Sequence, residues 1–217
     1  MKTSLTVFAA VIGFIMLTGV AACAGLTSND ETIRYKMTVT IETPEGENSS
    51  AVVREARCSY EKSILPDQGG NLSDVVKGEA VIVKFPSNEP VFGVISESGS
   101  EARFICSHRK IDKSASLQLP RHAFPNFVRF KNLQDPNTVE AIPYFDKKSV
   151  PSNLIFTPGV RVISVQINFT NEPISWEIDG YLPWLKQVKM SYLSGKQTAR
   201  GAPLGLQGGN FQRGENK

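Results

Sequence analysis

The chain has 217 residues, with 24 lysines and arginines against 21 aspartates and glutamates. The net charge is +3 and the two signs are interspersed, so no segment has the clustered basic and aromatic residues that nucleic-acid binding needs. We therefore expect no nucleic-acid partner. A chain of this length can bury one sizeable hydrophobic core.

The N-terminal segment has the pattern of an export signal. Lys2 is the only charged residue before Asp30, and the segment 5–20 is almost purely apolar. A positive residue followed by such a run is typical of a secretory signal peptide. It predicts that residues 1–22 are removed and that the rest of the chain lies on the outer side of a membrane.

The end of this leader carries a more specific motif. The residues Val20-Ala21-Ala22-Cys23 resemble the lipobox of bacterial lipoproteins, in which a small residue precedes the cysteine that receives the lipid. The resemblance implies that Cys23 becomes the lipidated N-terminus, with each buried methylene adding about 0.8 kcal/mol to membrane binding. Ala24, in place of Asp, implies the outer membrane rather than the inner one. The protein would then face the periplasm of the bacterial cell envelope.

Two other interpretations of the leader stay open. Ala22-Cys23-Ala24 also fits ordinary signal cleavage, which would leave a secreted soluble protein. The uncharged stretch 3–29 is long enough, against a need for about 20 apolar residues, to be retained as an anchor. Glycines and threonines dilute it, so we rank the anchor last. In the lipoprotein interpretation, residues 23–32 form a tether between membrane and fold.

The first strand signal follows directly. One face of the segment 33–41 is apolar and the other polar, and the apolar side chains are those of Ile33, Tyr35, Met37, Val39 and Ile41. This period of two predicts a half-buried strand. Turn-forming residues at 43–48 and a strand-like segment at 50–59 complete a predicted hairpin.

The middle of the chain predicts short strands and little helix. Segment 63–73 is a loop by composition, segments 79–85 and 90–96 predict a second hairpin, and 102–106 predicts a further strand. Four prolines interrupt the segment 119–144, so long regular structure is not expected there. Within it, Asp135 before Pro136 predicts one helical turn with Asp135 as N-cap.

The C-terminal third contains a second alternating strand, 159–170, and then a short helix within 174–189 that Pro183 interrupts. From residue 194 onward the chain is rich in Gly, Gln, Asn and basic residues, which predicts a disordered tail over 194–217. The pattern as a whole predicts a single, mainly β domain over residues 33–193. We expect an antiparallel sandwich-like or partly open barrel fold with one or two short helices near Val139 and Trp176.

Cys58 and Cys106 form an even pair once Cys23 is assigned to lipid. Each ends a strand-like segment and lies two positions after an apolar residue. Residues two apart share one face of a strand, so both cysteines are expected to point inward. In an oxidising compartment this predicts a disulfide, worth about 4 kcal/mol for a loop of this length. The alternative is two separate buried thiols.

The sequence lacks the common catalytic motifs. It has no Gly-rich phosphate loop, no His-Glu-x-x-His, no Gly-x-Ser-x-Gly and no Cys-x-x-Cys. Its two histidines, His108 and His122, stand in no recognisable catalytic or zinc-binding setting. We therefore expect no enzymatic activity, metal or cofactor. The rival hypothesis is a periplasmic hydrolase in which carboxylates such as Glu140 and Asp146 serve as acid and base.

Leu182-Pro183-Trp184-Leu185 is the candidate partner-binding segment. An exposed Trp184 would suit an envelope protein or a polysaccharide, since tryptophan is enriched at interfaces. The alternative, which burial statistics favour, is that Trp184 closes the core. We also consider the segment 119–144 a candidate contact region.

A weaker resemblance extends along the body of the chain. Several short segments resemble an uncharacterised family of small bacterial envelope proteins, namely Pro44-Glu45-Gly46, Gly78-Glu79-Ala80-Val81, Pro158-Gly159-Val160-Arg161 and Leu182-Pro183-Trp184-Leu185. The resemblance implies one folded unit from about Ile33 to Lys189 and no assigned activity. Together with the leader, it leads us to expect a membrane-tethered envelope lipoprotein that acts as a non-enzymatic binding or structural module.

Overall fold

A computed structural model describes residues 30–61, 70–85, 89–96, 99–112, 114–142, 154–157, 160–188 and 206–214. The chain divides into two compact units. The first unit is Met1–Glu31 with Ser59–Leu72, of which only a few residues are described. The second is Thr32–Cys58 with Ser73–Lys217, and it contains both hydrophobic cores. The predicted signal peptide, Cys23 and most of the predicted tether lie outside the described residues.

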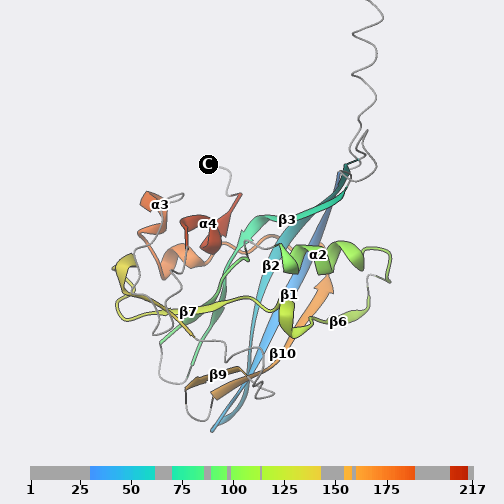
Figure 1. Ribbon diagram of the computed structural model, residues 1–217. Helices are drawn as coiled ribbons and strands as arrows, with labels where there is room; N and C mark the ends of the chain where they lie inside the picture. The colour runs from blue at the N-terminus through green and yellow to red at the C-terminus, as the bar shows by residue number, and fades with distance from the viewer. Residues whose placement is uncertain are drawn as a thin grey trace, which may run out of the picture. The chain divides into compact units, whose positions relative to one another are not determined.

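The fold is mainly β, as predicted, and consists of two antiparallel sheets that do not close into a barrel (Figure 1). The larger sheet has the order β11-β3-β2-β1-β10-β6, with β9 also paired to β10. Its strands are β1 (Glu31–Thr43), β2 (Gly46–Glu61), β3 (Gly70–Glu79), β6 (Ser116–Gln118), β9 (Leu154–Thr157), β10 (Val160–Phe169) and β11 (Gln212–Arg213). The smaller sheet has the order β4-β5-β7-β8 and consists of β4 (Val81–Val83), β5 (Val91–Gly93), β7 (Phe127–Phe130) and β8 (Val139–Ala141).

Short helices connect and cover the sheets. The α-helices of the described chain are α2 (Ser100–Ser107), α3 (Leu185–Val188) and α4 (Gly208–Phe211), and the 3-10 helices are η2 (Arg121–Ala123), η3 (Pro136–Thr138) and η4 (Ile178–Gly180). The helical turn predicted after Asp135 is η3, and the Asp135 side chain accepts a hydrogen bond from the backbone of Asn137 as its N-cap. The helix predicted near Trp176, with an interruption at Pro183, is present as two short pieces, η4 and α3, one on each side of Pro183.

The alternation of β1 positions the larger core. Every second residue from Tyr35 to Thr43 is buried, as the period of two predicts. The hairpin to β2 turns at Pro44 and Glu45, and Gly46 follows with a φ of 124°, a conformation that side chains other than glycine rarely adopt.

Strand β10 changes face along its length. It pairs with β1 over most of the strand, and the register shifts between Thr40 and Ile41. A bulge of this kind adds one residue to a strand and reverses which side chains face the core. Val160 and Val162 are therefore buried before the bulge and Val165 and Ile167 after it, with Ile163 exposed between them.

The predicted strand at 102–106 is wrong, because this segment is the helix α2. Gly99 precedes it in the left-handed conformation, with a φ of 63°. The buried residues of α2 are Glu101, Ala102, Ile105 and Cys106, a spacing that places them on one helical face. That face packs on the larger sheet (Figure 1), where Ala102 and Ile105 join the core formed by β1 and β2.

The prediction of a disordered tail is wrong for residues 206–214. Phe211 is completely buried in the second core, beside Leu206 and Trp184. The backbone of Phe211 accepts a hydrogen bond from Ala80 at 2.7 Å, and β11 pairs with β3. One buried aromatic and these backbone pairs fix a segment whose average composition is typical of disorder. Residues 194–205 and 215–217 lie outside the described part of the chain.

Candidate functional site

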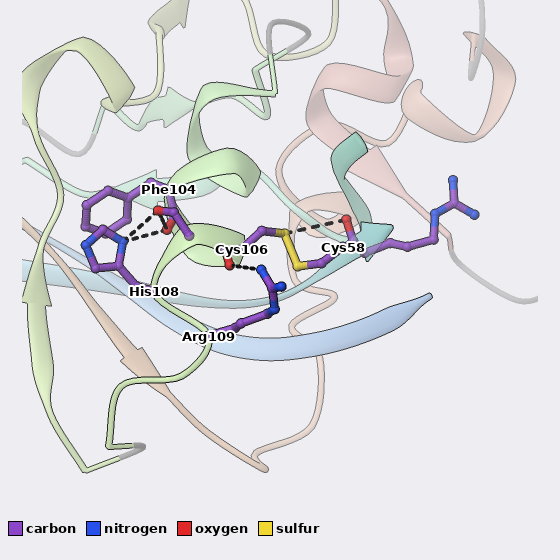
Figure 2. The surroundings of a disulfide bond; sticks show 7 residues. Cys58, Phe104, Cys106, His108 and Arg109 are labelled. Atoms are coloured by element: carbon purple, nitrogen blue, oxygen red, sulfur yellow. Dashed lines mark hydrogen bonds between the residues drawn. A yellow bond between two sulfur atoms is a disulfide. The ribbon is translucent and has the colours of Figure 1, made fainter. Parts of the chain in front are cut away.

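The predicted disulfide is present. Cys58 on β2 is bonded to Cys106 on α2, with their Cα atoms 5.6 Å apart. Figure 2 shows the bond beside the end of α2, where Arg109 donates a hydrogen bond to the carbonyl oxygen of Cys106 at 2.8 Å. Cys106 reaches this position from a helix and not from the expected strand. The bond therefore joins the helix covalently to the sheet beneath it.

His108, one of the two histidines considered for catalysis, belongs to the same helix end. Its Nδ1 lies 2.8 Å from the carbonyl oxygen of Phe104 and 2.9 Å from Ser107 Oγ. Its ring lies against the Phe104 ring, with centroids 4.2 Å apart (Figure 2). His122 is exposed in η2. The structure therefore places His108 as the residue that ends α2, while His122 belongs to the separate 3-10 helix η2.

A buried ion pair joins α2 to the larger sheet. The Arg54 side chain is fully buried, and its Nη1 donates to both carboxylate oxygens of Glu101 at 2.8 Å. Nε and Nη2 donate to the backbone carbonyls of Glu79 and Gly93, at 2.8 and 3.0 Å. The Tyr35 hydroxyl donates to the same Glu101 carboxylate. Every nitrogen of the guanidinium therefore has an acceptor, as a buried charge requires.

Electrostatics and backbone shape both fit this pair. Burial lowers the pKa of Arg54, but the interactions with Glu101 and Tyr35 together outweigh this effect, and the net pKa is raised. Burial, reinforced by the negative charge of Glu101, raises the pKa of Tyr35 well above its ordinary value. Gly78 leaves room for Arg54, because a Cβ at Gly78 would lie 2.8 Å from Arg54 Cγ. The pair is thus a charge-paired part of the core rather than an open site.

Sequence reasoning missed this pair. Arg54 has the same strand parity as Ala56 and Cys58, and that signal predicts an inward side chain. Glu101 gave no such signal, because it lies just before the predicted strand 102–106, outside any expected element.

Glu79 is a second buried carboxylate, at the end of β3. Its two oxygens accept hydrogen bonds from the backbone nitrogens of Glu177 and Ile178, both at 2.8 Å. Burial raises the pKa of Glu79, and these two hydrogen bonds oppose the rise. The carboxylate holds the start of η4 next to β3 and so positions the segment 175–178.

A groove of about 230 Å³ lies beside Glu79. The lining comes from β2, from the stretch around β4 and from the segment before η4, and comprises Asn48, Ser49, Ser50, Ala51, Val52, Glu79, Ala80, Ile82, Lys84, Ser175 and Glu177. Lys84 lies over the Tyr181 ring, 5.7 Å from its centroid. The lining thus combines hydroxyl and amide groups, one lysine, two glutamates and a small apolar surface. We take this groove as the candidate binding site.

Trp184 does not line this groove, and the hypothesis that it is an exposed anchor is wrong. Only 7% of Trp184 is exposed, and its ring lies among Phe130 and Phe211 in the second core. Its Nε1 donates a hydrogen bond to the Leu133 carbonyl at 2.8 Å. The alternative interpretation, that Trp184 closes the core, is the correct one.

Of the two carboxylates of the rival hypothesis, the structure describes only Glu140. Glu140 forms ion pairs with Lys131 at 2.7 Å and Arg129 at 3.2 Å, and the hydrogen bond from Lys131 lowers its pKa. Asp146 lies outside the described residues. Within the described ranges, no three or more His, Cys, Asp or Glu side chains gather as metal ligands, and no helix is long and apolar enough to cross a membrane.

The segment 119–144, considered as a contact region, is mostly structured. It contains η2, β7, η3 and β8, and two of these are strands of the smaller sheet. Its last two residues lie outside the described part.

Comparison with known proteins found no match for this chain to a family model, to a curated protein or to a solved structure.

Proposed function

We propose that the protein is a lipid-anchored component of the bacterial cell envelope, tethered through Cys23 and facing the periplasm, where it acts as a non-enzymatic binding or structural module. The observation that carries this proposal is the disulfide between Cys58 and Cys106. Disulfides persist in oxidising compartments such as the periplasm and are rare in the cytosol. The bond also uses both cysteines of the folded unit, which leaves Cys23 for the lipid.

The binding role is supported by the groove beside Glu79. The Glu79 carboxylate uses both oxygens to hold the backbone of Glu177 and Ile178, which is a structural task. Around it, hydroxyl and amide side chains offer hydrogen bonds to a partner.

The rival hydrolase has weaker support. Lys131 and Arg129 keep the pKa of Glu140 below its usual range, and a carboxyl with a lowered pKa is a poor general acid near neutral pH. We therefore keep the binding or structural module as the proposed function.

Metabolic labelling tests the anchor. The full chain and its Cys23→Ala variant are expressed in a bacterium with a palmitate analogue, and the label is read on the purified proteins. We expect label on the wild type only, with the wild type in the membrane fraction and the variant released to the periplasm. Equal labelling of the two would refute lipidation at Cys23, and no label on either would favour ordinary secretion. Cys58→Ala serves as the matched control, because it removes a cysteine and should keep the label.

A further inference from the structure

The groove runs along the edge of a strand. Five consecutive residues of β2, 48–52, line it. Side chains alternate between the two faces of a strand, so a consecutive run lines a groove only where the groove follows the backbone edge. On the opposite wall, after Glu79 at the end of β3, alternate residues take part, namely Ala80, Ile82 and Lys84. The stretch around β4 therefore presents one side-chain face to the open edge of β2.

Among the described residues, this edge is open because β3 diverges from β2. Gly78 of β3 lies directly beside Arg54 of β2, since a Cβ at Gly78 would be 3.1 Å from Arg54 Cα. Strand β3 ends at Glu79, and the chain continues as β4, which pairs with β5 in the smaller sheet. Among the described strands, none takes the place beside residues 48–52 that β3 has vacated.

The chain itself shows that this edge accepts a peptide backbone. Ser175 donates its N–H to the Val53 carbonyl at 3.2 Å, and Val53 donates its N–H to Ser175 Oγ at 3.0 Å. Backbone groups alternate in direction along a strand. The backbone N–H and carbonyl groups of Ser49 and Ala51 therefore point to the same side as those of Val53, into the groove. Asn48 closes one end, where its amide donates to the Lys84 carbonyl at 3.2 Å.

We propose that an extended polypeptide segment of a partner protein binds in this groove as an added strand. Its backbone pairs with Ser49 and Ala51, in line with Ser175, and its inward side chains pack on Ile82, which is only partly buried. Such strand addition takes its affinity from main-chain hydrogen bonds and its specificity from the side chains beneath. The proposal rests on the proposed binding role and names its partner class, but it does not depend on a lipid at Cys23.

Selection from phage-displayed random heptapeptides on the purified full chain provides the probe. The variant Ala51→Pro removes the N–H that faces the groove, and Ala51 is exposed, so no core packing is lost. The matched control Ala51→Thr keeps the N–H. We expect enriched heptapeptides to bind the wild type and Ala51→Thr alike, and Ala51→Pro about ten-fold or more weakly. Circular dichroism verifies that Ala51→Pro is folded.

Amide hydrogen exchange on the wild type gives an independent result that needs no variant. A saturating heptapeptide should slow exchange at Ser49 and Ala51 and leave Ser50 unchanged, since the Ser50 amide faces β1. Failure to enrich any heptapeptide, protection at other sites only, or equal binding by Ala51→Pro would each overturn the proposal. Because this assay uses purified protein, its failure is distinct from a failure of lipid labelling.

Discussion

The substitution Glu101→Gln tests the buried ion pair most directly. It removes one charge and keeps the side-chain volume, so Arg54 stays buried without its carboxylate partner. The two hydrogen bonds of 2.8 Å from Arg54 Nη1 and the one from the Tyr35 hydroxyl all end on Glu101. Breaking a buried pair on one side costs about 3–5 kcal/mol, because the remaining charge is uncompensated. That is a large part of the roughly 5–15 kcal/mol by which a typical domain is stable.

Urea unfolding at neutral pH, followed by circular dichroism with the disulfide intact, measures the loss. Tyr35→Phe is the matched control, because it removes only the hydroxyl donor and should cost about 1.5–3 kcal/mol. The double variant Arg54→Met with Glu101→Leu removes both charges. We expect it to be destabilised by much less than the sum of the single variants, since neither charge is left unpaired.

Two results would contradict this prediction: a Glu101→Gln variant within about 1 kcal/mol of the wild type, or a double variant that costs the full sum of the single ones. Either result would mean that Arg54 has no need of the carboxylate in the folded protein.

Two further predictions concern the segments that close the fold. Phe211→Ala should destabilise the protein by about 3–5 kcal/mol in the same urea assay, because Phe211 is fully buried in the second core; a change below about 1 kcal/mol would mean that the C-terminal segment does not pack there. Burial raises the pKa of Glu79, so the folded state keeps this proton over a pH range in which the unfolded chain has lost it. The stabilising contribution is full below the unfolded pKa and is lost as pH rises through the folded pKa. The stability of the wild type relative to Glu79→Gln should therefore fall as pH rises, and a rise would contradict the shift.

Local signals in the sequence predicted several elements correctly. The alternation from Tyr35 to Ile41 predicts a half-buried strand, because its apolar side chains all face the core while the residues between them face away. Asp135 and Pro136 predict a helical turn because N-capping involves only neighbouring residues. Cys58 and Cys106 were paired correctly from their number and the expected oxidising compartment, although the local structure assigned to Cys106 was wrong.

Other features depend on partners that are distant in the sequence. Arg54 pairs with Glu101, which lies 47 positions further along the chain. The pair forms only because Glu101 lies on the buried face of the helix α2. Phe211 fixes a segment of polar composition because the second core has space for its ring. The groove arises where the chain leaves β2 at the end of β3 and continues as β4, which pairs with β5 in the other sheet. Periodicity and capping act over one or two turns of chain, and the sequence alone determined them. Charge pairing, core closure and the open strand edge require segments to meet in space, and only the tertiary structure decided them.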